Sequence, residues 1–323
     1  MDERKLSPAL LTDESESLDA LRVEANAYVS SSKAATTRKA YASDWADFDA
    51  WCLKHKLSSL PAAPNTIALY LTHRARSLKT SSLERRLVSI GHMHRHAGHE
   101  NPAAANEVRE IWNGIRREKG TAKNRKNPAV TKLIRKMIAS LPDTLLGSRD
   151  AALLLLGYAG ALRRSELVNL DVADIETAEE GLVVTLKKSK TDQHGLGRRI
   201  GIPFGTFEIT CPVRAVNRWL EKSGVTDGPI FRSVNRHGQI KDERLGDRTV
   251  AEVVKRTLTA AGLEARNFAG HSLRSGFATM AALAGSTERE IQNQTGHKSL
   301  LVLRRYIHDG QLFKNGAASK LGL

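Results

Sequence analysis

Arginine, histidine and glutamate side chains recur at a spacing of three residues in two segments of the second half of the chain. The segment Ala-Leu-Arg-Arg-Ser-Glu-Leu contains Arg163 and Glu166, and the segment Gly-His-Ser-Leu-Arg contains His271 and Arg274. Residues three apart on a helix share one face, and two guanidinium groups can hold both non-bridging oxygens of one phosphate. Each segment alone also fits an ordinary ion pair or histidine on a helix surface. Together they indicate a phosphate-binding site.

A tyrosine follows these groups along the chain. The segment Thr-Gly-His-Lys-Ser contains His297, and the helical stretch after it ends in Arg-Arg-Tyr306. The chain has five tyrosines. Three of the others lie in the first half and the fourth lies in an apolar run that predicts core: Tyr28, Tyr41, Tyr70 and Tyr158. Only Tyr306 is close in sequence to the histidines and arginines, so it is the candidate nucleophile.

These residue types fit the attack of a tyrosine on a phosphodiester. Many nucleases neutralise the phosphate with two metal ions, but the sequence has no cluster of carboxylates at metal-ligand spacing. We therefore expect neither a metal nor another cofactor. Arg163 and Arg274 would instead stabilise the extra charge of the pentavalent transition state. Only about one free tyrosine in a thousand is ionised at pH 7, so His271 is expected to accept or orient the phenolic proton.

A mixture of helices and strands must position these residues. Two β-branched runs, 181–186 and 199–203, predict strands, and a polar, glycine-containing turn joins them. Hydrophobic residues at helical spacing predict helices elsewhere in this half, at 131–141, 148–163, 165–169, 212–222, 248–261, 272–284, 287–295 and 299–308.

The first half of the chain predicts helices alone. Hydrophobic residues recur at helical spacing in 18–32, in a stretch from Thr37, in stretches opened by Pro64 and by Ser81, and in 105–117. The aromatic residues at this spacing are predicted as core rather than as base-stacking groups: Trp45, Phe48, Trp51 and Trp112. Residues 1–17 predict a flexible polar leader. Residues 120–128 are basic and helix-breaking, which predicts an interdomain linker.

The order of the motifs resembles that of the tyrosine recombinase (phage integrase) family over nearly the whole chain. It runs from Ala-Leu-Arg-Arg-Ser-Glu-Leu, through a lysine in a strand-turn-strand, to His-Ser-Leu-Arg, Gly-His-Lys-Ser and Arg-Arg-Tyr. Ala161 stands where the family often has glycine, and His297 stands where some members carry tryptophan. The resemblance implies a mostly α fold with a small β-sheet in the C-terminal half. It implies a helical core DNA-binding domain at 18–119 and a mixed α/β catalytic domain at 129–323.

The resemblance also assigns roles to single residues. The catalytic residues would be Arg163, Lys190, His271, Arg274, His297 and Tyr306. His297 would add a further positive donor, and Glu166 would hold one of the phosphate-binding side chains in place. Lys190 would protonate the leaving 5′-oxygen, with Lys187 and Lys188 as rivals nearer the end of the first strand. The product would be a 3′-phosphotyrosine and a free 5′-hydroxyl, so religation needs no ATP.

The implied partner is double-stranded DNA with inverted-repeat half-sites, bound by a homo-tetramer without a small-molecule substrate. The C-terminal segment from residue 310 would link neighbouring protomers through its apolar residues, Leu312, Phe313, Leu321 and Leu323. Two other functions stay open, a type IB topoisomerase-like nicking and closing enzyme and a DNA-binding protein without catalysis. The helical first half argues against the former, and the complete set of catalytic residue types argues against the latter.

The charge of the chain favours an anionic partner. The net charge is +15 and the pI about 10.0, and both halves are basic although the first 24 residues are acidic. The residues expected to contact DNA gather at helix starts, on the fourth predicted helix and in the linker: Thr37, Arg38, Lys39, Lys79, Ser81, Ser82, Arg85, Arg86, Arg95, Lys123, Arg125 and Lys126. His92, His94, His96 and His99 lie nearby, and a metal site there is an alternative to a solvated or DNA-facing surface.

Composition argues against several other classes. No run approaches the ~18–20 apolar residues of a membrane span, and the acidic N-terminus lacks the apolar core of a signal peptide. We therefore expect a protein of the cytoplasm, associated with the nucleoid. Cys52 and Cys211 are far apart and have no metal-ligand companions, which predicts two buried free thiols.

Overall fold

The computed structural model describes residues 18–121, 126–187 and 197–311. Two compact units divide the chain between residues 123 and 124, and each has its own hydrophobic core. Several residues predicted to be functional lie outside the described residues: Lys123, Arg125, Lys188 and Lys190, together with Leu312, Phe313, Leu321 and Leu323. The predicted leader lies outside them as well.

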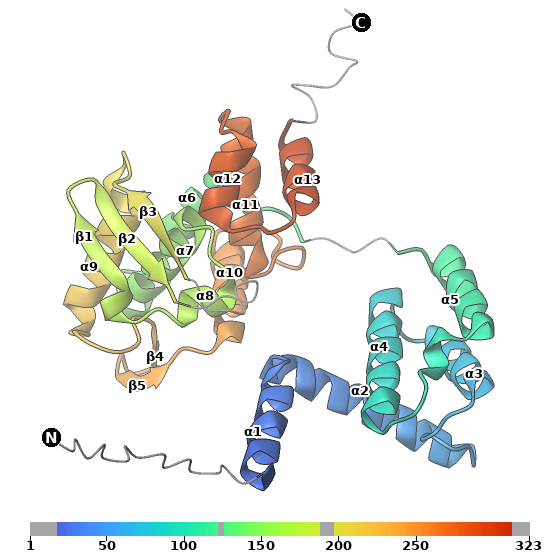
Figure 1. The fold of residues 1–323 in the computed structure, drawn as a ribbon. Coiled ribbons are helices and arrows are strands. Elements are labelled where there is room, and N and C mark those ends of the chain that lie inside the picture. The colour runs from blue at the N-terminus through green and yellow to red at the C-terminus, as the bar shows by residue number, and fades with distance from the viewer. Residues whose placement is uncertain (1–17, 122–125, 188–196, 312–323) are drawn as a thin grey trace, which may run out of the picture. The chain divides into compact units, whose positions relative to one another are not determined.

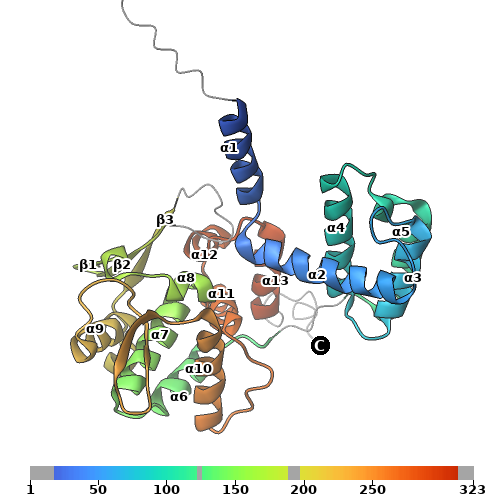
Figure 2. The ribbon, with the colours of Figure 1, turned by 90° about the horizontal axis from the view of Figure 1, so that it is seen from below.

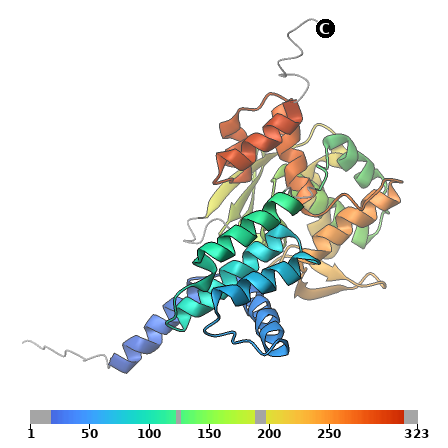
Figure 3. The ribbon, with the colours of Figure 1, turned by 90° about the vertical axis from the view of Figure 1, so that its right-hand side faces the viewer.

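The described residues of the first unit form helices and no strand, as predicted. α1 meets the start of the longer α2 at an angle (Figure 2), and α3, α4 and α5 gather beside α2 (Figure 3). The bounds are α1 Leu18–Ser31, α2 Ala35–Lys54, α3 Pro64–Ala75, α4 Thr80–His96 and α5 Asn106–Lys119, with a short 3-10 turn, η1, at Pro102–Ala104. Pro64 occupies the first turn of α3, where its fixed φ favours the helix and no N–H is needed.

Aromatic side chains fill the core of the first unit. Phe48 and Tyr70 are fully buried, with ring centroids 5.0 Å apart in an edge-to-face arrangement. Trp51 is buried beside them, and Trp45 and Trp112 pack against the same cluster. The predicted aromatic core is therefore confirmed.

A three-stranded antiparallel sheet, in the order β1-β2-β3, lies on one side of the second unit (Figure 1). β2 (Gly181–Leu186) and β3 (Arg198–Pro203) confirm the two predicted strands. Three strands were not predicted: β1 (Ile175–Ala178) and the separate hairpin of β4 (Arg232–Val234) and β5 (Ile240–Arg244). These strands are short and only exposed or half-buried, so no apolar run marks them.

The helices of the second unit pack mainly against one another, with α7 at the centre. α7 is apolar on nearly every side and is buried against α9 and α11. α11, α12 and α13 lie side by side in the part of the unit next to β3 (Figure 1). The bounds are α6 Thr131–Ala139, α7 Leu145–Ala159, α8 Arg164–Val168, α9 Pro212–Ser223, α10 Asp247–Ala260, α11 His271–Leu283, α12 Glu288–Thr295 and α13 Leu300–Gln311, with 3-10 turns η2 at Val172–Asp174 and η3 at Glu208–Thr210.

Two further expectations concern the chain as a whole. None of the helices in the described parts of the chain is long and apolar enough to cross a membrane. Cys52 and Cys211 are buried and unpaired, as predicted.

Candidate active site

The turn between α7 and α8 carries Arg163. A continuous helix over 148–163 was predicted, but α7 ends at Ala159, and Ala161 adopts a left-handed backbone with φ of 48°. Arg163 is therefore not on a helical face with Glu166, because it is the N-cap of α8. The Glu166 carboxylate accepts the backbone N–H of Arg163 at 2.9 Å and pairs with its guanidinium Nη1. A nearly buried carboxylate thus holds Arg163 in place.

Arg274 lies in the first turn of α11 and is almost completely buried. Its Nη1 donates to the carbonyl oxygen of Ala161 at 2.8 Å. Its Nε and Nη2 are buried without a hydrogen-bond partner among the described residues. Burial and then the charge of Arg163 lower the pKa of Arg274 to about 9. Buried unpaired donors are rare and costly. Here the two donors could bind an anion.

Tyr306 lies on α13 within reach of a histidine on α11. Its Oη is 3.2 Å from Nε2 of His271. The His271 ring stays accessible to solvent, yet partial burial, followed by the charges of Arg274 and Arg163, lowers its pKa. The imidazole is therefore neutral at pH 7. A neutral imidazole at this distance can accept the phenolic proton.

His297 lies just beyond the end of α12. Thr295 Oγ1 donates to the carbonyl oxygen of Ile291 at 2.7 Å, so it accepts from Nδ1 of His297 at 2.8 Å. The ring is 5.9 Å from the Tyr306 ring, centroid to centroid. Burial and then the charge of Arg274 lower the pKa of His297 to about 3. The expected positive donor is therefore a neutral imidazole in the free protein, with Nε2 unprotonated.

A third guanidinium, which was not predicted, lies beside these groups. Arg198 is the first residue of β3, and its Nη1 donates to the carbonyl oxygens of Gln294 at 2.8 Å and Asn293 at 3.2 Å. Its Nη2 is 3.8 Å from Oε2 of Glu166. Burial lowers the pKa of Arg198. A signal was available in the sequence, because the period of two in a strand places residue 198 on the buried face of Ile200 and Ile202.

The lysine candidates are only partly described. Lys188 and Lys190 lie outside the described residues. The Nζ of Lys187 pairs with Oδ1 of Asp174 at 2.6 Å, and this carboxylate raises the lysine's pKa. A lysine with a raised pKa is a weaker proton donor, which makes Lys187 a poor general acid.

The predicted DNA contacts divide into exposed and internally paired residues. Thr37 and Arg38 lie in the first turn of α2, and Lys39 follows them. Lys79 is the N-cap of α4, and Ser81 and Ser82 lie in its first turn. Neither Ala34, the N-cap of α2, nor Lys79 caps its helix with a side-chain hydrogen bond, so backbone N–H groups remain available for phosphate. Arg95 is exposed, and Lys126 is exposed but donates to the carbonyl oxygen of Arg266 at 2.6 Å.

Arg85 and Arg86 pair with carboxylates of α2 instead, although the Arg85 side chain stays 52% exposed. Arg85 donates to both oxygens of the buried Asp44, at 2.6 and 3.0 Å. Arg86 donates to Asp47 at 2.6 Å and to the Tyr70 hydroxyl at 2.9 Å, and its side chain is only 14% exposed. The structure thus gives Arg86 a structural role within the first unit.

The histidine-rich end of α4 shows a similar internal use. The backbone N–H of Ala62 donates to Nε2 of the buried His94, whose Nδ1 therefore donates to the carbonyl oxygen of Ile90 at 2.8 Å. In the described parts of the chain, no group of three His, Cys, Asp or Glu side chains is arranged to hold a metal ion.

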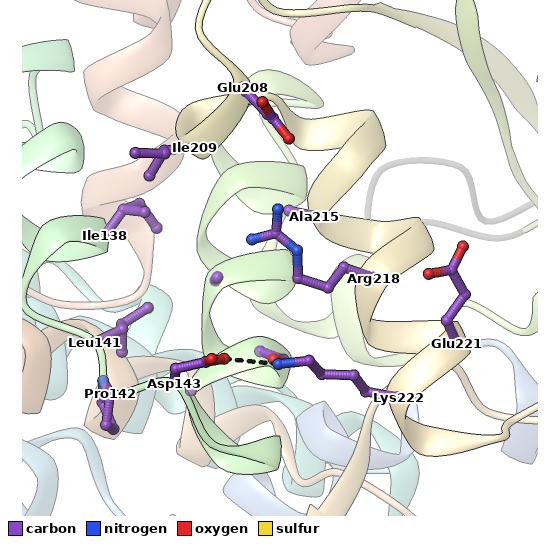
Figure 4. A pocket seen from close by; sticks show the side chains of 13 residues that line it. Ile138, Leu141, Pro142, Asp143, Glu208, Ile209, Ala215, Arg218, Glu221 and Lys222 are labelled. Carbon is purple, nitrogen blue, oxygen red and sulfur yellow. Dashed lines mark hydrogen bonds and ion pairs between the residues drawn. The ribbon is translucent and has the colours of Figure 1, made fainter.

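A pocket of about 390 Å³ lies elsewhere in the second unit (Figure 4). It is lined by residues of α6, α7, α9, η3 and the turn before α7, and the ion pair of Asp143 with Lys222 crosses part of it at 2.6 Å. None of the predicted catalytic residues lines it, so it is not part of the candidate active site.

Comparison with known proteins identifies the family of the chain. The model of the phage integrase family matches residues 129–311. The integrase/recombinase XerD homolog of Selenomonas ruminantium is 40% identical over 311 residues, which cover 95% of this chain and 91% of that protein. Recombinase Cre of Escherichia phage P1 is 26% identical over 281 residues, which cover 80% of each.

Solved structures show the same fold. A lambda integrase dimer bound to a COC′ core site superposes with a TM-score of 0.60 at 20% identity, covering 90% of this chain and 94% of that one. XerH site-specific recombinase in a post-cleavage complex with palindromic difH substrate gives 0.59 at 18% identity, covering 80% and 72%. The predicted fold class is therefore confirmed. The chain belongs to the phage integrase family and is a DNA strand-transfer enzyme of the tyrosine recombinase type.

Proposed function

We propose that this enzyme cuts and rejoins duplex DNA at specific sites through a 3′-phosphotyrosine on Tyr306. The observation that carries the proposal is the pair of Tyr306 and His271, 3.2 Å apart from Oη to Nε2. Arg274 adds two buried donors that have no partner among the described residues. These contacts support the assignment of Tyr306 as nucleophile, of His271 as base and of Arg274 as a donor to the phosphate oxygens.

We infer the chemical step from these groups and, for Lys190, from the family resemblance. The Tyr306 oxygen bonds to phosphorus while its proton passes to Nε2 of His271, and the bond from phosphorus to the 5′-oxygen breaks. Lys190 supplies the proton that the 5′-oxygen needs on leaving. Arg163 and Arg274 hold the non-bridging oxygens, and the phosphotyrosine keeps the bond energy for religation, so neither ATP nor a metal is required.

The assembly and the division of labour are also proposals. Residues 18–119 would clasp the DNA, residues 120–128 would link the units, and residues 129–323 would carry the chemistry. The related structures include a dimer on a core site and a complex with a palindromic substrate, which supports inverted-repeat half-sites here. Two such pairs would form a homo-tetramer that acts on the DNA of the nucleoid.

Covalent trapping tests the chemistry. The wild-type protein and Tyr306→Phe would be mixed with nicked duplexes from the DNA that flanks its own gene, with EDTA present, and then denatured. A protein–DNA adduct in the wild type that is absent in the variant is the expected result. An adduct that survives Tyr306→Phe would overturn the assignment of the nucleophile.

Two further outcomes separate the alternatives. DNA that binds but gives no adduct would favour a binding protein without catalysis. An adduct without exchange between two sites would favour a nicking and closing enzyme.

A further inference from the structure

Arg198 brings a third guanidinium group into the candidate active site. The proposed reaction gives this group no direct role. We propose that Arg198 is a positioning residue that holds Glu166, and through it Arg163, together with the end of α12 that leads into His297. Because the readout is formation of the phosphotyrosine, this role rests on the proposed function.

The first contact ties Arg198 to the end of α12. The last carbonyl groups of a helix lack intrahelical partners and carry partial negative charge. Arg198 Nη1 satisfies two of them, on Gln294 at 2.8 Å and Asn293 at 3.2 Å. Gly296, which caps α12 with φ of 63°, leaves room for this, because a Cβ there would lie 2.8 Å from the Arg198 Cζ. The guanidinium therefore packs against the backbone just before His297.

The second contact is with Glu166. Nη2 of Arg198 is buried, has no hydrogen-bond partner in the described parts of the chain, and lies 3.8 Å from Oε2 of Glu166. The same carboxylate pairs with the guanidinium and the backbone of Arg163. Glu166 thus lies between two guanidinium groups. Without Arg198 it would keep one charged partner and could shift together with Arg163.

The strand makes this arrangement rigid. Ile200 and Ile202, on the same face of β3 as Arg198, are buried, so the strand cannot turn Arg198 toward solvent without exposing them. A second tie runs from Gln294 Nε2 to the carbonyl oxygen of Gly201 at 3.2 Å. β3 and the end of α12 are therefore clamped at two points.

The test compares Arg198→Gln and Arg198→Lys with a matched control, Arg199→Gln. Arg199 follows in the same strand, its side chain is 63% exposed, and it pairs with Glu176 on β1, so its variant removes the same charge without touching the site. We expect Arg198→Gln to slow adduct formation roughly 10- to 100-fold, the usual cost of losing an outer supporting partner. DNA binding should stay near wild type, whereas the melting temperature should fall, because two carbonyl groups at the end of α12 lose their donor. Arg198→Lys should recover part of the rate, and Arg199→Gln should equal wild type.

A neutral substrate separates positioning from general structural damage. A methylphosphonate at the scissile position removes the negative charge that Arg163 must balance, so misplacement of Arg163 costs less there. The ratio of wild-type to Arg198→Gln rates should fall clearly on this substrate. An equal ratio on both substrates, or a wild-type rate for Arg198→Gln on ordinary DNA, would overturn the proposed role. If Arg198→Gln does not fold, the ratio of wild-type to variant rates on the two substrates is measured for Arg198→Lys instead. Absence of an adduct from the wild type would instead sink the phosphotyrosine function itself.

Discussion

The Nη1 of Arg274 donates to the carbonyl oxygen of Ala161 at 2.8 Å, and Ala161 presents that oxygen from a left-handed backbone with φ of 48°. The same turn leads two residues later into Arg163. One short reversal of the chain therefore positions both arginines that we propose to bind the phosphate, one through a carbonyl group and the other through the backbone. A side chain in the left-handed region costs roughly 1–2 kcal/mol, which the surrounding packing must offset.

Substitutions at Ala161 should reveal this arrangement. Ala161→Gly removes the strain and a small buried methyl group, so the free energy of unfolding should change by less than about 1 kcal/mol and adduct formation should persist. Ala161→Val should lower stability by roughly 2 kcal/mol or more and slow adduct formation, because a β-branched residue is poorly tolerated at positive φ and overpacks the site. Urea unfolding and single-turnover trapping would measure both. A valine variant as stable and fast as wild type would contradict the role of the turn.

The low-pH side of the pH–rate profile should report the ionisation of His271. Partial burial and the charges of Arg274 and Arg163 lower its pKa below the ordinary 6.5. Because the neutral form must accept the proton, activity is present above the pKa and lost as pH falls through it. The second-order rate constant of adduct formation should therefore hold down to pH 6.5 and fall only below it. His271→Gln should form the adduct more slowly and should not show this fall in rate at low pH. A wild-type rate that already falls above pH 7 would argue against His271 as the base.

The two lysine candidates Lys187 and Lys190, which both follow β2 in the sequence, should behave differently. Lys187 is paired with Asp174, so Lys187→Ala should change the rate little. Lys190→Ala should slow adduct formation by about 10²- to 10⁴-fold, the usual worth of a general acid. A substrate with sulfur in place of the bridging 5′-oxygen should restore the Lys190→Ala rate, since a thiolate leaves without a proton. Restoration of a Lys187→Ala defect by the same substrate would reverse the assignment.

Two basic residues of the first unit should separate DNA contact from stability. Lys39 is exposed near the start of α2. Lys39→Ala should reduce the slope of log affinity against log salt by about 0.9, the effect of one phosphate contact. Arg86→Ala should instead lower the free energy of unfolding by about 1–3 kcal/mol, because it leaves Asp47 and Tyr70 with fewer partners. Salt-dependent binding and urea unfolding on both variants would show whether the two effects are distinct.

Much of the fold was predictable because burial requires a periodic pattern. The helices and the two apolar strands have such patterns, whereas β5, with three exposed residues in five, has none. The end of α7 was misplaced because its apolar run continues through Ala161 and Leu162, which are buried in the turn, and periodicity alone does not show where the helix stops. Arg163 was consequently placed on a helix instead of at a cap.

For the described residues around Tyr306, the sequence supplied candidate residue types but not their charges. Arg198 was missed because the predicted strand began one residue later, which hid its place on the buried face of β3. His297 was expected to carry a positive charge, and only the structure reveals the burial that lowers its pKa to about 3. Residue identity fixes which groups can ionise, while solvation and neighbouring charges decide whether they do.

Arg163, Arg198 and Arg274 crowd around a single carboxylate, Glu166, and their mutual repulsion contributes to the lowered pKa of Arg274. The protein without DNA therefore tolerates repulsion that an anion would relieve. By mass action, any oxyanion that binds between these arginines stabilises the native state. Inorganic phosphate or sulfate should therefore raise the melting temperature and compete with DNA. The cluster of arginines that prepares the site for an anionic substrate thus lowers the melting temperature of the DNA-free enzyme.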